Sequence, residues 1–188
     1  MPEIDLPDPA LSDRAVVLRT MRPDDVPALV AACQDPLIPR YTRVPHDYGE
    51  PEARAWLEES ERQRRAGAGL HLLICEEGGG DLLGSVGLNA VDWVDLRARI
   101  GYWVAAEARR RGSASRATRL LAVWAIRSLG LERIEIDADV DNLASHRTAE
   151  RAGFVREAVL RSHRQRRDGR SDAVVFGLIR GDLPTTDE

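Results

Sequence analysis

The sequence predicts an α/β (α+β) fold, a single domain in which a mixed, mostly antiparallel sheet is flanked by helices. Stretches of alternating or continuous apolar residues, which are typical of strands, are separated by segments whose apolar residues recur at helical spacing. These segments follow in the order strand, helix, helix, strand, strand, strand, helix, strand, helix, strand, strand. This order gives six to seven strands and about four helices, and 188 residues are enough to bury a sizeable core.

The N-terminal half holds three of the predicted strands and two of the helices. The first helix begins near Arg22, because a proline and two acidic residues follow it, as is favoured in a first helical turn. The glycines at 78–80 and the following aspartate predict a hairpin turn, since they separate two apolar runs. The other elements predicted here are strands over Ala15–Met21, Leu70–Cys75 and Leu82–Val91 and a helix over Pro51–Ala66.

The C-terminal half holds the other four strands and two helices. Arg133–Val140 alternates strictly between charged and apolar residues, which predicts a half-buried strand. A helix begins at Ala114, because small or apolar residues recur there at helical spacing as far as Gly130, a residue favoured just beyond a helix end. The other elements predicted here are strands over Arg97–Ala105, Phe154–Arg161 and Ala173–Ile179 and a short helix over Asn142–Ala152.

The composition argues against several classes of function. A net charge of −4 disfavours nucleic-acid binding, and no apolar run approaches the roughly 20 residues that a membrane-spanning helix needs. The segment Met1–Asp13 lacks the basic and apolar regions of a signal peptide, so a cytoplasmic location is expected. Cys33 and Cys75 lack the spacing of metal ligands, which predicts two buried thiols and no metal site.

The run Arg109–Ala114, which reads Arg-Arg-Arg-Gly-Ser-Ala, lies between a predicted strand and a predicted helix. The first N–H groups of a helix have no intrahelical partners, and the helix dipole adds partial positive charge at the same end. Small residues at this position let a bulky phosphate approach the backbone closely. The run therefore predicts an anion site that suits a diphosphate.

The same run resembles the Arg/Gln-x-x-Gly-x-Gly/Ala signature of the GNAT family of acetyl-CoA-dependent N-acetyltransferases. Other motifs around it are similar to the Rim-like subgroup, which is typified by the ribosomal-protein N-terminal alanine acetyltransferases. These motifs are Leu18-Arg19, Leu83–Gly87, Gly101–Val104, Asp141–Ser145 and Ala149–Phe154. The resemblance covers residues 14–183, as one N-acetyltransferase domain, and leaves 1–13 and 184–188 as tails.

The resemblance implies a V-shaped splay between two central strands, with acetyl-CoA bound in it. In the family, main-chain amides that match Arg111–Ser115 hold the diphosphate, and strand residues that match Trp103 and Val104 pair with the pantetheine amides. The arginines before Gly112 either contact phosphate or form a solvated turn, and Asn142 either bonds the cofactor or caps a helix. The residues expected to contact acetyl-CoA are Trp103, Val104, Arg109, Arg110, Arg111, Gly112, Ser113, Ala114, Ser115, Asn142 and Ser145.

Ser145 matches a serine that lies near the thioester sulfur in the Rim-like subgroup, where it is proposed to protonate the leaving thiolate. Many other GNATs place a tyrosine four residues before the Gly-Phe pair, and Ala149 stands there in this chain, which favours Ser145 as the catalytic residue. The glutamate that relatives often carry two residues before Gly-Tyr-Trp is replaced by Arg99. The remaining candidates for a base, of which none stands out, are Asp92, Asp95, Glu157 and His163.

The resemblance thus implies an N-acetyltransferase in which a primary amine attacks the acetyl thioester directly, most similar to the enzymes that acetylate N-terminal alanine. Two alternatives stay open. These are acetylation of a small-molecule amine and a catalytically silent acetyl-CoA-binding module, for which Arg99 and Ala149 leave room. The acceptor amine, on a protein N-terminus or a small molecule, is expected to be selected by Pro39–Tyr48, the second helix and Asp92–Arg97. The chain is expected to be a monomer or a homodimer.

Overall fold

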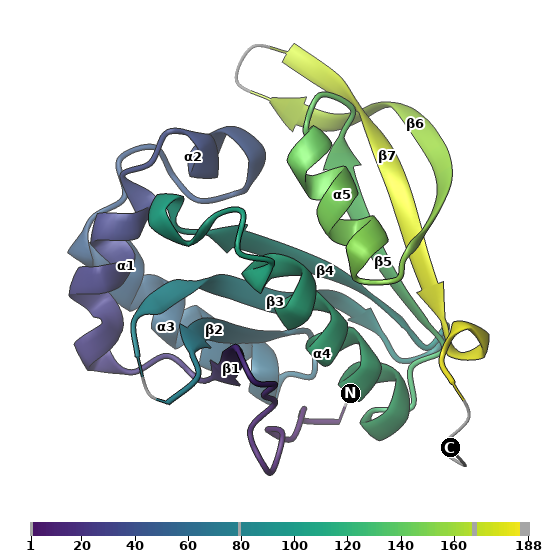
Figure 1. Ribbon diagram of the computed structural model, residues 1–188, viewed down its shortest axis with the longest axis horizontal. Helices are drawn as coiled ribbons and strands as arrows, with labels where there is room; N and C mark the ends of the chain where they lie inside the picture. The colour runs from purple at the N-terminus through teal and green to yellow at the C-terminus, as the bar shows by residue number, and fades with distance from the viewer. Residues whose placement is uncertain (1, 79, 167–168, 185–188) are drawn as a thin grey trace.

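Seven strands pair into one sheet, in the order β1-β2-β3-β4-β5-β7-β6, in the computed structural model, which describes residues 2–78, 80–166 and 169–184 (Figure 1). The strands are β1 (Val16–Arg19), β2 (Leu70–Glu76), β3 (Leu82–Asp92), β4 (Arg97–Val104), β5 (Arg133–Asp139), β6 (Val155–Arg166) and β7 (Gly169–Ile179). Strands β4 and β5 are parallel, and the other neighbours are antiparallel. The predicted fold class is therefore confirmed.

Five α-helices accompany the sheet in the described residues, one more than the sequence predicts. They are α1 (Val26–Cys33), α2 (Leu37–Tyr41), α3 (Glu50–Arg65), α4 (Ser113–Ser128) and α5 (Leu143–Arg151). The additional helix is α2, which lies partly in the segment Pro39–Tyr48 that was expected to help select the acceptor. Its five residues are too few for an apolar repeat, and it is held instead by burial of Ile38 and by a 2.8 Å hydrogen bond from the Leu37 amide to Asp35.

Each predicted strand and helix is present, with ends that differ by a few residues. The last two strands, β6 and β7, differ most from their predicted bounds. Their pairing continues from Leu160 and Ala173 to Arg166 and Gly169 through polar residues. Those residues are polar and either exposed or only partly buried, so they carry no apolar pattern that a sequence could reveal. Strand length here is set by backbone pairing rather than by burial of side chains.

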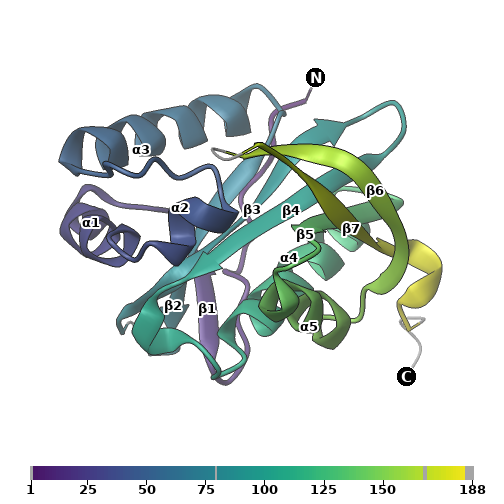
Figure 2. The same cartoon turned by 90° about the horizontal axis from the view of Figure 1, so that it is seen from above.

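Helices cover both faces of the sheet: α1 and α3 lie on one face, and α4 and α5 lie on the other (Figure 2). The larger core lies beneath α4, whose stripe of Ala117, Leu121 and Ala125 is completely buried. A smaller cluster on the opposite face includes Cys75, and Cys33 is buried in a third. Both thiols are buried as predicted, and none of the helices described is long and apolar enough to cross a membrane.

The two central strands β4 and β5 pair over three residues only, from Arg97↔Arg133 to Arg99↔Glu135. Beyond this point β4 continues along β3 as far as Val104, while β5 continues along β7 as far as Asp139. The two strands therefore diverge, and their backbones form a V in the middle of the sheet (Figure 1). The splay that the resemblance implies is present.

The N-terminal segment lies against α3. The side chain of Ile4 is completely buried, its amide donates to the Arg64 carbonyl at 3.1 Å, and its own carbonyl accepts from the Arg64 guanidinium at 2.8 Å. Within the predicted C-terminal tail of residues 184–188, only Pro184 is among the described residues. The domain boundaries at residues 14 and 183 remain predictions.

Thr118 in α4 generates a prediction about stability. Its side chain is completely buried, and its hydroxyl has no hydrogen-bond partner among the residues that the structure describes. A buried hydroxyl without a partner costs free energy, so Thr118→Val should raise the free energy of unfolding by about 1 kcal/mol, or the melting temperature by roughly 2–4 °C. Thermal denaturation followed by circular dichroism measures this effect.

The matched control is Thr118→Ser, which keeps the hydroxyl and removes the methyl group. It should lower the melting temperature, because it leaves a small cavity beside an unchanged polar group. A lower melting temperature for Thr118→Val than for the wild type would show that the hydroxyl is satisfied in solution.

Candidate active site

The loop between β4 and α4 has the backbone geometry of an anion site. Arg110 and Gly112 both have positive φ angles, of 65° and 81°, and α4 begins immediately afterwards at Ser113. The first amide that bonds back within the helix is that of Arg116, which donates to the Gly112 carbonyl at 3.1 Å. The amides of residues 113–115 thus precede the hydrogen-bond ladder of α4 and are available to an anion.

Of the three arginines in this loop, Arg109 is engaged elsewhere. Its guanidinium lies 2.6 Å from the carboxylate of Asp35, which joins the loop to the segment after α1. Arg110 and Arg111 are exposed, and Arg111 also lines a cavity of about 540 Å³ together with Asp35 and Glu107. That cavity does not include Trp103, Asn142 or Ser145 in its lining. Arg109 is therefore held in the turn by an ion pair, and the exposed arginines are those that a ligand can reach.

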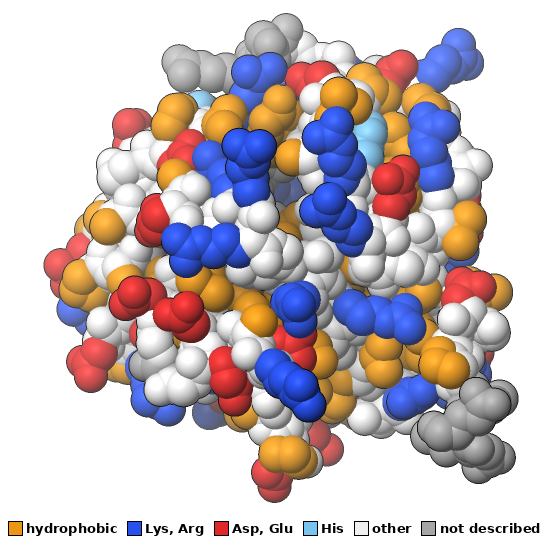
Figure 3. All heavy atoms as spheres, viewed as in Figure 1, with side chains coloured by type: hydrophobic (Ala, Val, Ile, Leu, Met, Phe, Trp, Pro, Cys, Tyr) orange, Lys and Arg blue, Asp and Glu red, His pale blue; other side chains and the backbone are white. Residues whose placement is uncertain are grey.

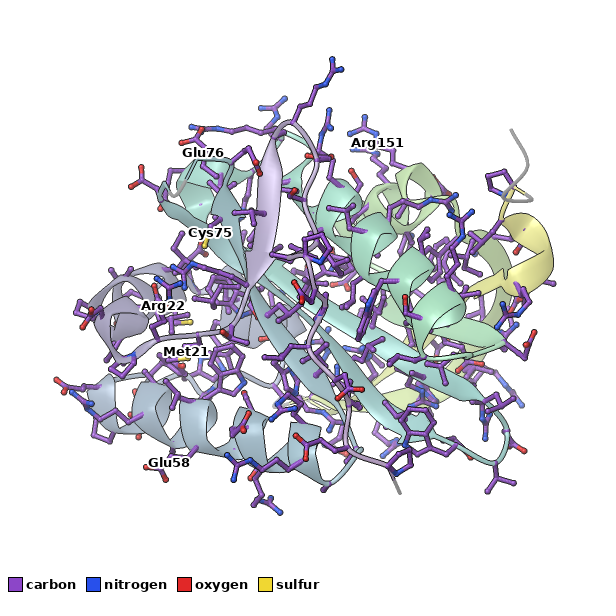
Figure 4. All side chains as sticks on the ribbon, turned by 90° about the horizontal axis from the view of Figure 1, so that it is seen from below. Met21, Arg22, Glu58, Cys75, Glu76 and Arg151 are labelled. Atoms are coloured by element: carbon purple, nitrogen blue, oxygen red, sulfur yellow. The ribbon has the colours of Figure 1, made fainter. Side chains whose placement is uncertain are left out.

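Arginines also gather on the outer side of α4 and α5, where Figure 3 shows a group of blue side chains near the centre of the view. The exposed ones on these helices include Arg116, Arg147 and Arg151. Figure 4 shows Arg151 extending from the protein near α5. Although the net charge is −4, this side of the molecule is locally basic, which favours a phosphate-bearing ligand at the start of α4.

The second half of β4, Gly101–Val104, forms one wall of the V. One edge of this segment pairs with β3, from Gly101↔Gly87 to Val104↔Gly84, whereas no described strand pairs with its other edge. Tyr102, Trp103 and Val104 are each only partly buried, although β4 is a central strand. The free edge presents backbone donors and acceptors to an extended ligand, as an unpaired strand edge does.

The opposite wall ends in α5, whose first turn is fixed by Asn142. The Asn142 side-chain oxygen accepts the Ser145 amide at 3.1 Å, so the interpretation of Asn142 as a helix cap is confirmed. This bond uses the side-chain oxygen and leaves open whether the amide nitrogen also contacts a ligand. Through the cap, Asn142 sets the position of Ser145.

Tyr102 is not among the residues that the sequence predicts to contact acetyl-CoA, but its hydroxyl reaches across to Ser145. The two side-chain oxygens are 2.7 Å apart, and the Tyr102 hydroxyl also donates to the Ser145 carbonyl at 3.2 Å. Burial raises the pKa of Tyr102 to about 12, so the phenol keeps its proton at neutral pH. Tyr102 is thus a site residue that sequence reasoning missed, because alternation along a strand predicts a face and not a partner.

The face of β5 that is turned away from α4 carries three carboxylates, and each has an arginine partner. Glu135 accepts from Arg133 at 2.8 Å and lies 3.7 Å from Arg99. The other two pairs, which involve arginines of β6, are Asp137 with Arg164, at 2.8 Å, and Asp139 with Arg166. These carboxylates are therefore engaged in ion pairs at the wall of the V.

The four candidates for a base also have partners. His163 lies 3.9 Å from Asp137. Glu157 is paired with Arg133, which lowers its pKa, and hydrogen bonds from the backbone amides of residues 95 and 94 lower the pKa of Asp92. Asp92 and Asp95 both lie near Arg97, beyond the closed end of the V. The described residues thus offer no unpaired carboxylate among these candidates.

Helix α2 bridges the two arms at the open end of the V. Arg40 lies 3.2 Å from Asp141, which follows β5. The ring of Tyr41 lies under the guanidinium of Arg166, at 5.3 Å, at the end of β6. Figure 1 shows α2 on one side of this opening and α5 on the other. Part of the predicted acceptor segment Pro39–Tyr48 therefore does lie at the mouth of the V.

Two proteins of Bacillus subtilis have sequences similar to this chain. The protein named "Putative ribosomal N-acetyltransferase YdaF" in Bacillus subtilis (strain 168) is 35% identical over 101 residues, 54% of this chain and 55% of YdaF, so the match spans about half of that relative. The uncharacterized N-acetyltransferase YoaA of the same organism is 26% identical over 172 residues, 92% of this chain and 97% of YoaA.

Among solved structures, RimL, described as a ribosomal L7/L12 alpha-N-protein acetyltransferase in complex with Coenzyme A, has the same fold. Its TM-score is 0.83 at 21% identity, and the match covers 90% of this chain and 97% of that chain. The family model described as "Acetyltransferase (GNAT) domain" matches residues 15–155, which include both walls of the V and the loop before α4. On this evidence the chain belongs to the GNAT family of acetyltransferases.

Proposed function

We propose that this acetyl-CoA-dependent N-acetyltransferase acts on an α-amine at a protein N-terminus. The observation that carries the proposal is the V between β4 and β5, which opens beside the free amides at the start of α4. An extended thioester fits an unpaired strand edge, and its diphosphate fits a helix N-terminus. The name of YdaF refers to the ribosome and that of RimL to alpha-N-protein acetylation, and both support a protein acceptor.

The residues proposed to bind acetyl-CoA fall into three groups. The amides of Arg111–Ser115 hold the diphosphate. Gly112 adopts a positive φ and has no side chain that would cover the backbone at this point. The free edge of Trp103 and Val104 bonds the pantetheine amides, and Asn142 and Ser145 contact it from the opposite wall. Arg110 and Arg111 add favourable charge, whereas Arg109 acts through its ion pair with Asp35 and stabilises the turn.

Ser145 is the proposed hydrogen-bond donor to the departing sulfur. The thioester supplies an activated acetyl group, so the protein has to orient the amine, polarise the carbonyl and stabilise the sulfur as the C–S bond breaks. Ser145 lies at the first turn of α5, is only partly buried, and has its amide fixed by Asn142. From this position its hydroxyl can donate to the departing sulfur, while Ala149 offers no hydroxyl.

The ion pairs on β5 favour an acceptor that is partly neutral without help from a base. An α-amine with a pKa near 7.8 is ~30% neutral at pH 7.5, whereas a lysine or polyamine nitrogen with a pKa near 10.4 is only ~0.1% neutral. This difference of more than two orders of magnitude matters most in a site whose carboxylates are already paired with arginines. It favours an N-terminal α-amine over a side-chain or polyamine nitrogen.

An acceptor screen tests the function. Release of free thiol from acetyl-CoA should be fastest with peptides that begin with Ala or Ser, slower with lysine side chains and polyamines, and should rise with pH through the acceptor's own pKa near 8. Changing the acceptor to one of higher pKa should move the rising limb to higher pH by the same amount. Preference for a small-molecule amine would contradict the proposal, and tight acetyl-CoA binding without turnover on any amine would identify a silent binding module.

Gly112 tests the diphosphate site. A Cβ at this residue has open space, since its nearest neighbour would be Ser115 Oγ at 3.9 Å, but the φ of 81° is unfavourable for any L side chain. The strain is about 1–2 kcal/mol, so Gly112→Ala should displace the loop and weaken acetyl-CoA binding roughly tenfold, as measured by calorimetry.

The matched control is Gly130→Ala, at the other end of α4. Its φ is 74° and a Cβ there would also meet nothing within 4 Å, so the strain is similar while the distance from the loop is the length of the helix. Its melting temperature should fall with unchanged affinity for acetyl-CoA. Equal affinities for all three proteins would overturn the proposed diphosphate site.

Ser145→Ala tests this donor to the sulfur. It should lower kcat about 10- to 100-fold and change the affinity for acetyl-CoA by less than about twofold, because the hydroxyl is proposed to act mainly as sulfur departs. Ser128→Ala, at the exposed end of α4, is the control for loss of a serine hydroxyl and should leave both values unchanged. A Ser145→Ala protein with wild-type kcat would remove Ser145 from the mechanism.

A further inference from the structure

The Tyr102 side chain crosses from β4 to α5 and meets the side chain of Ser145 at 2.7 Å. We propose that Tyr102 is a positioning residue for Ser145: it holds the serine hydroxyl beside the thioester and strengthens it as a donor when sulfur departs. This inference rests on the proposed function, in which Ser145 acts on the sulfur. It adds to the site a residue of β4 that acts through its side chain rather than its backbone.

The two walls of the V position the Tyr102 and Ser145 side chains from opposite sides. Along β4 the side chains of Ala98, Ile100 and Tyr102 share one face, and the first two are buried in the core beneath α4 and α5. On α5 the Ser145 amide is fixed by the cap from Asn142. The Ser145 hydroxyl can still rotate, and Tyr102 is the group that fixes its direction.

The hydrogen bonds allow two arrangements of the hydroxyl protons. In one, Tyr102 donates to the Ser145 carbonyl at 3.2 Å and accepts from the Ser145 hydroxyl. In the other, Tyr102 donates to the Ser145 hydroxyl oxygen, which leaves the serine proton for the sulfur. Negative charge on sulfur favours the second arrangement, because a chain of hydrogen bonds that ends on a charge strengthens each member.

The pKa of Tyr102, which burial raises to about 12, decides against Tyr102 as the acid itself. Complete transfer of its proton to a thiolate with an ordinary pKa near 8.5 would therefore be unfavourable. The phenol therefore keeps its proton and donates a hydrogen bond. The Ser145 hydroxyl is a weaker acid than the phenol, so it also keeps its proton and stabilises the thiolate by a hydrogen bond. Overall, the N–C bond forms, the C–S bond breaks, and the proton that the amine releases to water is matched by the one that the thiolate takes up.

The small side chain of Ala149 leaves space for the Tyr102–Ser145 pair. It lies one helical turn after Ser145 on the same face of α5, is completely buried, and belongs to the cluster against which Tyr102 packs. This is the position at which many GNATs carry a tyrosine. In this chain the small side chain on α5 and the large one on β4 are complementary, so a phenol reaches the site from the other wall.

The test begins with a measurement that needs no acceptor. The thiol pKa of CoA bound to the protein can be followed by the ultraviolet absorbance of the thiolate. If Ser145 and Tyr102 act together, Ser145→Ala and Tyr102→Phe should each raise this thiol pKa by about one pH unit. Ser145→Ala removes the hydrogen bond to the thiolate, and Tyr102→Phe removes the hydrogen bond that supports the serine hydroxyl. The double variant should match Ser145→Ala, because Tyr102 acts only through the serine.

Turnover with an active amine should show the same dependence. Tyr102→Phe should lower kcat about tenfold with an unchanged KM for acetyl-CoA, and should have no effect in the Ser145→Ala background. Thr118→Val, which removes a buried hydroxyl that has no described partner, controls for general effects and should leave kcat unchanged. The melting temperature and the affinity for CoA of each variant establish that it is folded.

The outcomes separate this inference from the proposed function. Equal effects of Tyr102→Phe on kcat in the wild-type and Ser145→Ala backgrounds would mean that Tyr102 has a structural role. An unchanged thiol pKa in folded Tyr102→Phe would mean that Tyr102 has no role at the sulfur. Either result overturns the inference, whereas turnover by the wild type would still support the proposed function. The expected pattern of thiol pKa values in a protein that acetylates no amine would support the Tyr102–Ser145 pair and reject the proposed acetyl transfer. If Tyr102→Phe does not fold, Ser145→Thr, which keeps a hydroxyl, should retain a lowered thiol pKa, and loss of that effect would count against the pair.

Discussion

The short parallel pairing between β4 and β5 is the constraint on which the rest of the site depends. Only three residue pairs join these strands, and beyond Arg99 each strand is committed to its outer neighbour. The packing at Gly84 shows how closely β3 and β4 approach each other, because a Cβ at this residue would lie 2.2 Å from the Trp103 carbonyl oxygen. Since β4 is held against β3 without room for a side chain, its inner edge stays open. The opening is therefore a property of the sheet, and it does not require a ligand to hold it.

The two faces of this opening have different electrostatic environments. On the side of α4 and α5, exposed arginines and free helix amides create a basic surface within a chain whose net charge is negative. On the other side, carboxylates of β5 and arginines of β4, β5 and β6 form pairs, so charge is present but mutually compensated. One face thus attracts a polyanion, whereas the other can receive a small cationic group without strong attraction or repulsion. This division suits the proposed placement of the thioester, with its nucleotide end on the basic face and its reactive end on the other.

Much of the fold follows from sequence patterns, because long strands and helices with one buried face have a clear period. The loop before α4 is also predictable, since a glycine and small residues at a helix start have a local physical meaning. Helix α2 is not, because five residues carry no period and its stability comes from Ile38 and the Asp35 side chain. The Tyr102–Ser145 pair is not predictable either, since it joins residues 43 positions apart, and the ion pairs of β5 depend on how far β6 folds over β7.

The contacts of α2 give the site an uneven stiffness. At its closed end the V is held by backbone pairing in the middle of a seven-stranded sheet, which cannot yield without loss of the core. At its open end, the link from α2 to the opposite arm includes the ion pair between Arg40 and Asp141, whose side chains are 60% and 56% exposed. Such a pair contributes between zero and about 1 kcal/mol and is screened by salt. The mouth of the V is thus held by side-chain contacts, whereas its vertex is fixed by backbone pairing, so the strand edge proposed to hold the thioester is anchored in the more rigid part of the fold.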